Sequence, residues 1–259
     1  MEHPAQGVSC TQLIYYDHIR EKCSLKVVAM EEISVPEDLY AKRLANKDNV
    51  KKWHAQARAE KSIKALEKNG FIALWVEDRN IAREEILKLI PESATVGVGG
   101  SMTIRETGVL QVLTQKGHTI YDHWVPGLSQ EEILNIRRAQ LTSDVFLTST
   151  NALTLDGELV NTDGIGNRIG AMTFGPKKVI VVAGVNKIVA DVHAAIRRIK
   201  EIAAAPAMKE SNIPIPCVQT GICIDCDSPM RLCRATLILE RRPMLTDMTV
   251  MIVGEELGF

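Results

Sequence analysis

Four cysteines close together in the last fifth of the chain are the residues best suited to chemistry. They are Cys217, Cys223, Cys226 and Cys233, in the spacing Cys-x5-Cys-x2-Cys-x6-Cys, with a glycine two residues before the central pair. Four thiolates at this density can surround one tetrahedral metal ion or one cuboidal iron-sulfur cluster. The pattern therefore predicts a metal site with four cysteine ligands.

The spacing leaves the identity of the metal open. It is neither the ferredoxin run Cys-x2-Cys-x2-Cys-x3-Cys nor the paired Cys-x2-Cys of a zinc ribbon. We favour a [4Fe-4S] cluster over zinc, and the alternative to any metal is a set of free or redox-paired thiols. Cys10 and Cys23 lie far from this group and are interpreted as ordinary thiols.

A glycine-rich segment is the first of three loops that could bind a ligand. Gly97, Gly99 and Gly100 let the backbone turn tightly and approach a ligand without interference from a Cβ atom. Ser101 and Thr103 add hydroxyls beside the free N–H groups of an expected helix start, a place that attracts anions. The segment is neither a Walker loop nor a complete dinucleotide fingerprint. The alternative is a structural turn in which Thr103 and Glu106 form a capping box.

The second loop, Ser149-Thr150-Asn151, and the third, residues 161–168, carry further polar side chains. Asp163 can accept protons or hydroxyl hydrogens, and Arg168 can hold a phosphate or carboxylate through two hydrogen bonds. The alternative for the third loop is an Asx turn and helix cap with a surface arginine. The predicted ligand-binding residues of the three loops are Gly97, Gly99, Gly100, Ser101, Thr103, Asn151, Asn161, Asp163, Gly164, Gly166, Asn167 and Arg168.

Two further side chains are less specific candidates. His123, beside Asp122, would serve as a general acid or base if it faced the ligand, although a loop histidine is more often simply hydrogen-bonded. Lys187 follows a valine-rich strand and could contact a substrate. We interpret it as a solvated lysine at the start of a helix.

These loops are positioned by alternating strands and helices. Helices are expected at 47–68, 81–90, around 103–116, 129–141, 164–174 and 188–202, and strands at 71–76, 94–98, 119–121, 145–148, 178–183, 235–240 and 249–253. Asp156-Gly157 predicts a β-hairpin, and residues 203–216 are expected to be a connection. The alternation predicts an α/β fold whose mainly parallel sheet has helices on both faces. Such sheets bind ligands at the carboxyl ends of their strands.

Composition narrows the class of protein. The chain has 259 residues, 46% of them hydrophobic, and a formal net charge of −1, which gives no electrostatic footprint for nucleic acid or an anionic membrane. No apolar run is long enough to cross a bilayer, so we expect a cytoplasmic protein without membrane insertion. We expect a partly irregular N-terminal extension at 1–46 and one domain at 47–259 that includes a cysteine-rich segment at 214–234. Met30 is hypothesised to be the true start.

Several motifs together resemble the LUD (lactate utilisation) domain family. They are the segments 94–106, 122–128, 146–152 and 161–168, and the match is collinear from about Val50 to the closing residues 254–259. The resemblance implies a NagB/ribose-5-phosphate isomerase/CoA-transferase-like fold. Neither the catalytic glutamate of the CoA transferases nor the acid set of the sugar isomerases is found, so the resemblance carries the fold rather than a reaction.

The resemblance also implies a role in the oxidation of lactate and related organic acids. The expected protein is a metal- or iron-sulfur-containing subunit or accessory protein that binds a small anionic metabolite, with iron-sulfur oxidoreductase subunits as partners. One alternative is a stand-alone enzyme that acts on a phosphorylated or CoA-linked metabolite and holds a structural zinc. Another is a sensor that binds a metabolite without catalysis.

Overall fold

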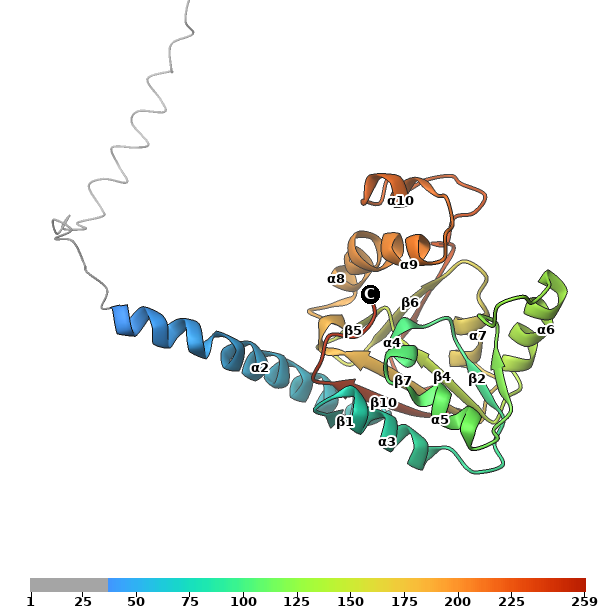
Figure 1. Ribbon diagram of the computed structural model, residues 1–259, viewed down its shortest axis with the longest axis horizontal. Helices are drawn as coiled ribbons and strands as arrows, with labels where there is room; N and C mark the ends of the chain where they lie inside the picture. Colours follow the sequence, from blue (N-terminus) through green and yellow to red (C-terminus); the bar gives the residue numbers. More distant parts are fainter. Residues whose placement is uncertain (1–36) are drawn as a thin grey trace, which may run out of the picture. The chain divides into compact units, whose positions relative to one another are not determined.

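The computed structural model describes residues 37–259 (Figure 1). Residues Asp48–Phe259 form one compact unit, and the chain up to Lys47 is assigned to another. The predictions for Cys10, Cys23, Met30 and most of the N-terminal extension lie outside the described residues.

Most of the described α-helices overlap helical segments expected from the sequence, although the expected helix around 103–116 is divided into two at Gly108. The described α-helices are α2 (Glu37–Lys68), α3 (Arg79–Leu89), α4 (Met102–Glu106), α5 (Val109–Gln115), α6 (Gln130–Gln140), α7 (Asn167–Thr173), α8 (Val192–Arg198), α9 (Ala204–Glu210) and α10 (Pro216–Thr220). Ser129 and Glu132 cap α6 reciprocally, as their spacing predicts. None of the helices between residues 37 and 259 combines the length and the apolar character needed to span a membrane.

The main sheet has six strands, and every neighbouring pair is parallel. Its order is β1 (Ile72–Val76), β10 (Asp247–Val253), β7 (Lys178–Gly184), β4 (Val145–Ser149), β2 (Val96–Val98) and β3 (Ile120–Asp122). The central strands are rich in valine and isoleucine because both of their faces are buried. The prediction of a parallel α/β sheet is confirmed.

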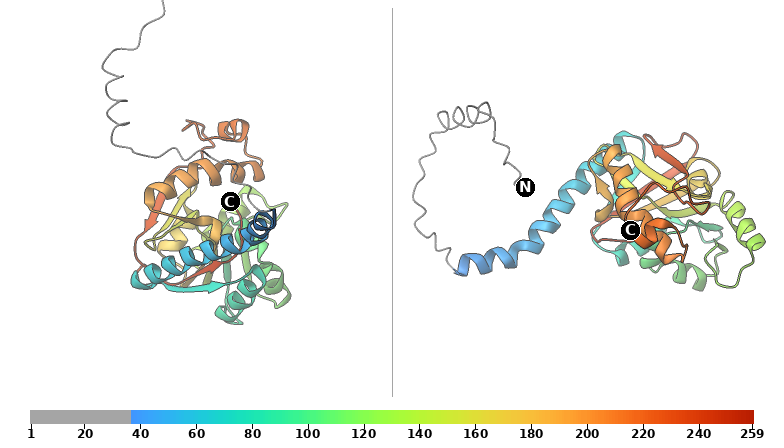
Figure 2. Two further views of the ribbon diagram at one scale, coloured as in Figure 1. Left: turned by 90° about the vertical axis from the view of Figure 1, so that its left-hand side faces the viewer. Right: turned by 90° about the horizontal axis from the view of Figure 1, so that it is seen from above.

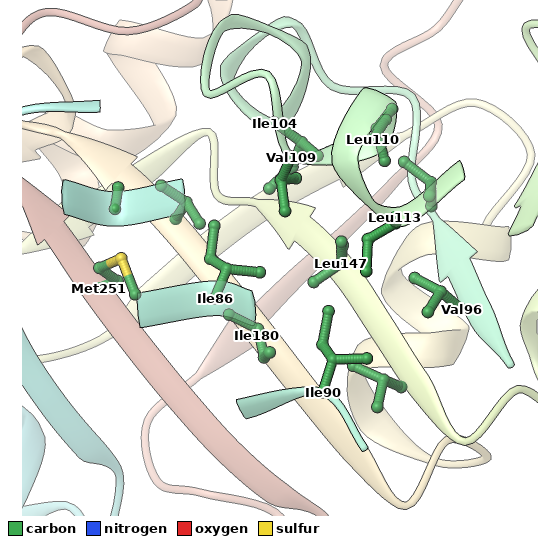
Figure 3. Packing of buried hydrophobic residues seen from close by; sticks show 14 of the residues in the cluster. Ile86, Ile90, Val96, Ile104, Val109, Leu110, Leu113, Leu147, Ile180 and Met251 are labelled. Atoms are coloured by element: carbon green, nitrogen blue, oxygen red, sulfur yellow. The ribbon is translucent and has the colours of Figure 1, made fainter. Parts of the chain in front are cut away.

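Alternate residues of each strand supply two separate cores. On one face Leu147 and Ile180 pack with Ile86 of α3 and Leu113 of α5 (Figure 3). On the other face a second cluster, including Phe146, joins the strands to α2, α7 and a smaller sheet. Figures 1 and 2 show α8 and α9 on the opposite side of the main sheet from α3 and α5. Both faces are therefore covered.

The smaller sheet has the order β8 (Ile188–Val189), β5 (Ala152–Thr154), β6 (Leu159–Asp163) and β9 (Ala235–Leu239). β5 and β6 form the hairpin predicted from Asp156-Gly157. β9 pairs antiparallel with β6 along its whole length, so the chain leaving the cysteine-rich segment is fixed beside residue Asp163.

Three local expectations are wrong. The segment 188–202 begins as strand β8, and α8 starts only at Val192, where the Asp191 side chain caps it. The expected connection at 203–216 contains helix α9, which continues α8 through a π-helical turn at Ile199–Ala203, and its alanines favour helix. The cap of α4 is Ser101, whose hydroxyl accepts from the N–H of Ile104, so the predicted capping box at Thr103 is absent.

Candidate functional site

A cavity of about 260 Å³ lies at the carboxyl ends of the central parallel strands. Its walls come from the segments that follow β2, β3, β4 and β7, from the end of β6, and from α9. The three loops singled out in the sequence meet here, because parallel strands deliver the loops that follow them to one edge of the sheet.

Eight of the twelve predicted ligand-binding residues line this cavity: Gly100, Ser101, Thr103, Asn151, Asp163, Gly164, Asn167 and Arg168. Gly97, Gly99, Asn161 and Gly166 do not. Gly97 lies within β2, where a Cβ would be 2.7 Å from the Ser143 hydroxyl, and a Cβ on Gly99 would be 3.0 Å from the Thr148 hydroxyl. These two glycines permit close packing rather than contact with a ligand.

Asn161 and Gly166 support the wall from behind. Asn161 is fully buried, and its amide oxygen accepts from the backbone N–H of Asn151 and from Arg168. Gly166 has a φ of 93° and begins α7, a conformation that side chains other than glycine adopt rarely.

The hydrogen-bond donors of Arg168 are all used by other residues of the protein. Its guanidinium makes six hydrogen bonds, to the side chains of Asp163, Asn161 and Asn151 and to two backbone carbonyls. The ion pair with Asp163 is 2.7 Å long and largely buried. Arg168 therefore organises the loops and its charge is balanced, which differs from the expectation that it grips a ligand.

Lys187 lies in the cavity wall, and its interpretation as a solvated lysine is wrong. The side chain is only 4% exposed, because the turn Val185–Lys187 directs it inward after β7. Its Nζ donates to the hydroxyls of Thr103 and Ser149 at 2.9 Å each, and no carboxylate among the described residues pairs with it. Burial, reinforced by the charges of Arg198 and Arg168, lowers the pKa of Lys187 to about 7.

Arg137 of α6 is a lining residue that sequence reasoning missed. Its Nε is buried without a hydrogen-bond partner, and within residues 37–259 the guanidinium has no ion pair. Burial lowers the pKa of Arg137, although an arginine remains charged. Its place one turn from Ile133 and from the buried Gln140, on the inner face of α6, is the signal that could have identified it.

His123 also lines the cavity, as a neutral imidazole. It is 9% exposed, and its Nδ1 lies 2.9 Å from the Nε2 of Gln140. Burial and the nearby charge of Arg137 lower the pKa of His123 to about 4. The amide of Gln140 also donates to the carbonyls of Val98 and Tyr121 and accepts from Asn167, so this group of residues is rigidly held.

The four cysteines line a second, much smaller cavity of about 20 Å³. Cys217 lies in the short helix α10, which Gly221 ends with a φ of 73°, and the N–H of Asp225 donates to the sulfur of Cys223 at 3.5 Å. Arg231 clamps the segment by donating to the carbonyls of Cys226 and Cys233. The four cysteines thus line one small cavity, and their service as a common set of metal ligands stays a prediction.

Metal binding at this group would require the thiols to lose their protons. Burial and the neighbouring cysteines raise the pKa of the thiols of Cys217 and Cys233, so without a cation these thiols are protonated. Four sulfur donors suit zinc or an iron-sulfur cluster. All four are free thiols, and in the described part of the chain no three or more Cys, His, Asp or Glu side chains already stand in the arrangement of a metal site. Metal binding here stays a prediction.

Comparison with known proteins identifies the family. A search of curated proteins returned no match. Among solved structures, a DUF162 family protein from Deinococcus radiodurans is 17% identical, with a TM-score of 0.40 over 78% of this chain and 98% of its own. Ribose 5-phosphate isomerase A from Neisseria gonorrhoeae is 14% identical, with a TM-score of 0.29 over 44% and 54%. The family model of the LUD domain matches residues 59–253, and the chain therefore belongs to the LUD domain family.

Proposed function

We propose that this LUD protein binds a small carboxylate or related anion in its larger cavity. The observation that supports the proposal most strongly is that Arg137 and Lys187 line one cavity and neither forms an ion pair within residues 37–259, although the exposed Glu210 also lines this cavity. A buried charge without a partner is costly, and an anion that enters the cavity offsets that cost. Asp163 does not do so, because it is paired with Arg168.

Uncharged donors add to the cationic groups. The hydroxyl of Ser101 accepts from a backbone N–H, which leaves its own hydrogen free to donate to a ligand. A carboxylate accepts several such hydrogen bonds, and charge-assisted ones are the strongest. The site therefore favours a carboxylate such as that of a 2-hydroxy or 2-oxo acid.

The biological role that fits this site and the family is the oxidation of lactate and related organic acids, with the chain as a subunit or accessory protein. Cys217, Cys223, Cys226 and Cys233 would hold the metal, and a [4Fe-4S] cluster bound there would supply one-electron transfer. A reducing compartment such as the cytoplasm would keep these thiols available. Iron-sulfur oxidoreductase subunits would be the partners.

Calorimetric titration with pyruvate, L-lactate and inorganic phosphate tests the anion site. Arg137→Leu is expected to weaken binding by about 1.5–3 kcal/mol, roughly ten- to 150-fold, because it removes a charge-assisted contact. Arg138→Leu on the same helix is the matched control, since Arg138 is exposed and bonds only Asn135. Equal affinity in the two variants would contradict the proposal.

Purification without oxygen, followed by iron, sulfide and zinc analysis, tests the cysteine site. Iron and sulfide with broad absorbance near ~400 nm would support the cluster. Stoichiometric zinc without colour would favour the alternative in which the metal is structural. Replacement of Cys223 and Cys226 by Ser is expected to remove either metal. A wild-type protein that retains neither metal would argue against a metal site.

A further inference from the structure

The larger cavity has two chemically different ends. Lys187, Arg137 and Ser101 belong to its polar part, whereas the walls supplied by α9 and the cysteine-rich segment are largely apolar. The residues that line the cavity there are the apolar Ala203, Ala207, Met208, Ile213 and Leu232 and the polar Glu210 and Ser211. A ligand that fills this cavity must therefore offer an anionic end and an apolar end.

The size of the cavity also favours a ligand that has an apolar end. The volume of about 260 Å³ is well above the roughly 10–15 Å³ that one water molecule needs on the same measure. Pyruvate and lactate have only six non-hydrogen atoms, so either would leave the apolar end unfilled. Empty apolar space forfeits contacts that a longer ligand would make.

The apolar end is also the wall of the cysteine site. Met208 and Leu232 line both cavities, and both pack in one hydrophobic cluster with Cys217. Leu232 directly precedes Cys233 in the chain. One layer of side chains therefore separates the ligand cavity from the four thiols.

The backbone ties this wall firmly to the ligand-binding loop. The N–H of Arg234 donates to the carbonyl of Asp163 at 3.1 Å. A Cβ on Gly164 would lie 3.1 Å from the Cδ1 of Leu232, so the loop and the leucine are in close contact. A change in the position of Cys233 would consequently move the wall of the ligand cavity.

We propose that the ligand is an organic acid with an apolar chain longer than that of pyruvate, and that this chain rests on Met208 and Leu232. The cysteine site then acts as the support of a specificity wall, and metal and ligand strengthen each other's binding. This inference rests on the proposed anion site, but it makes a separate statement about the other end of the cavity.

A series of 2-oxo acids of increasing chain length provides the test. Calorimetry with pyruvate, 2-oxobutanoate and 4-methyl-2-oxopentanoate is expected to show affinity rising about fourfold for each added methylene. Leu232→Ala should lower the affinity for 4-methyl-2-oxopentanoate at least about tenfold and leave that for pyruvate nearly unchanged. Ile224→Ala is the matched control, because Ile224 lines only the cysteine cavity and is 54% exposed.

The linkage to the metal is measured on the same protein. Zinc-loaded protein is expected to bind 4-methyl-2-oxopentanoate more tightly than chelator-treated protein, with a smaller difference for pyruvate. Affinity that is independent of chain length, in wild type and in Leu232→Ala alike, would overturn this inference while pyruvate binding through Arg137 still stood. Absence of binding by all three acids would overturn the anion site as well.

Discussion

Burial of the charged side chain of Lys187 costs folding free energy. Its Nζ donates to the hydroxyls of Thr103 and Ser149 and forms no ion pair within the described residues, and the nearby charge of Glu106 only partly offsets the effect of burial on its pKa. Residues held in such a state are common where a protein binds a charged ligand. An anion in the cavity would reduce the free-energy cost of burying the charge of Lys187.

The pH dependence of stability should reveal this cost. The folded pKa of Lys187, about 7, lies below that of an unfolded lysine, about 10.4, so between these values only the unfolded chain holds the proton. The destabilisation is therefore fully present below pH 7 and declines as the pH rises toward 10. Lys187→Met is expected to be more stable than wild type at pH 6 by at least about 1 kcal/mol, and less so at pH 9, in urea unfolding. A difference that does not vary with pH would contradict this assignment.

At the scale of elements, the β5–β6 hairpin is the feature on which the second sheet depends. Its turn contains Gly157, which has a φ of 79° and lies so close to α2 that a Cβ would be 2.6 Å from the backbone of Ala65. The turn is therefore restricted both by its backbone conformation and by the helix packed against it.

Gly157→Ala is expected to lower the free energy of unfolding by about 2 kcal/mol or more, because conformational strain and a backbone clash add together. Gly117→Ala is the control, since Gly117 has a φ of 81° but open space around it, and should cost only about 1 kcal/mol. Denaturant unfolding monitored by circular dichroism measures both. Equal losses would show that contact with α2 does not limit this turn.

At the scale of the whole molecule, the candidate site lies where the two sheets meet. Arg168 donates to Ser149 at the end of β4 in the main sheet and to Asn161 and Asp163 in β6 of the smaller sheet. The same residue thus shapes the cavity and joins the sheets. Substitution of Arg137 is expected to change anion binding, whereas substitution of Arg168 is expected to change global stability.

Arg168→Met is expected to lower the free energy of unfolding by about 3–5 kcal/mol, because it leaves the buried carboxylate of Asp163 without its partner. The double variant Arg168→Met, Asp163→Asn should recover part of this loss, since the unpaired charge is gone. Thermal or urea unfolding of both proteins provides the measurement. A single variant as stable as wild type would show that the ion pair does not hold the sheets together.

Patterns that depend on neighbouring residues were readable in the amino-acid sequence. Alternation of strands and helices predicts the parallel sheet, Asp156-Gly157 predicts the hairpin, and the motifs around residues 94–106 and 161–168 identify the LUD family. The close spacing of the four cysteines likewise predicts that they lie together, and they line one small cavity. These features follow from local backbone preferences and hydrophobic periodicity, which act over a few residues.

Only the tertiary structure decided which side chains face the ligand cavity and which are already satisfied. Arg168 resembles a ligand-binding arginine in sequence, but its donors are occupied by residues from the second and third loops. Arg137 and Lys187 resemble surface residues, but packing of the turn after β7 buries Lys187 and packing of α6 buries the Nε of Arg137, and neither side chain forms an ion pair in the described chain. Burial and long-range pairing are properties of the packed molecule, because they depend on neighbours that are distant along the chain.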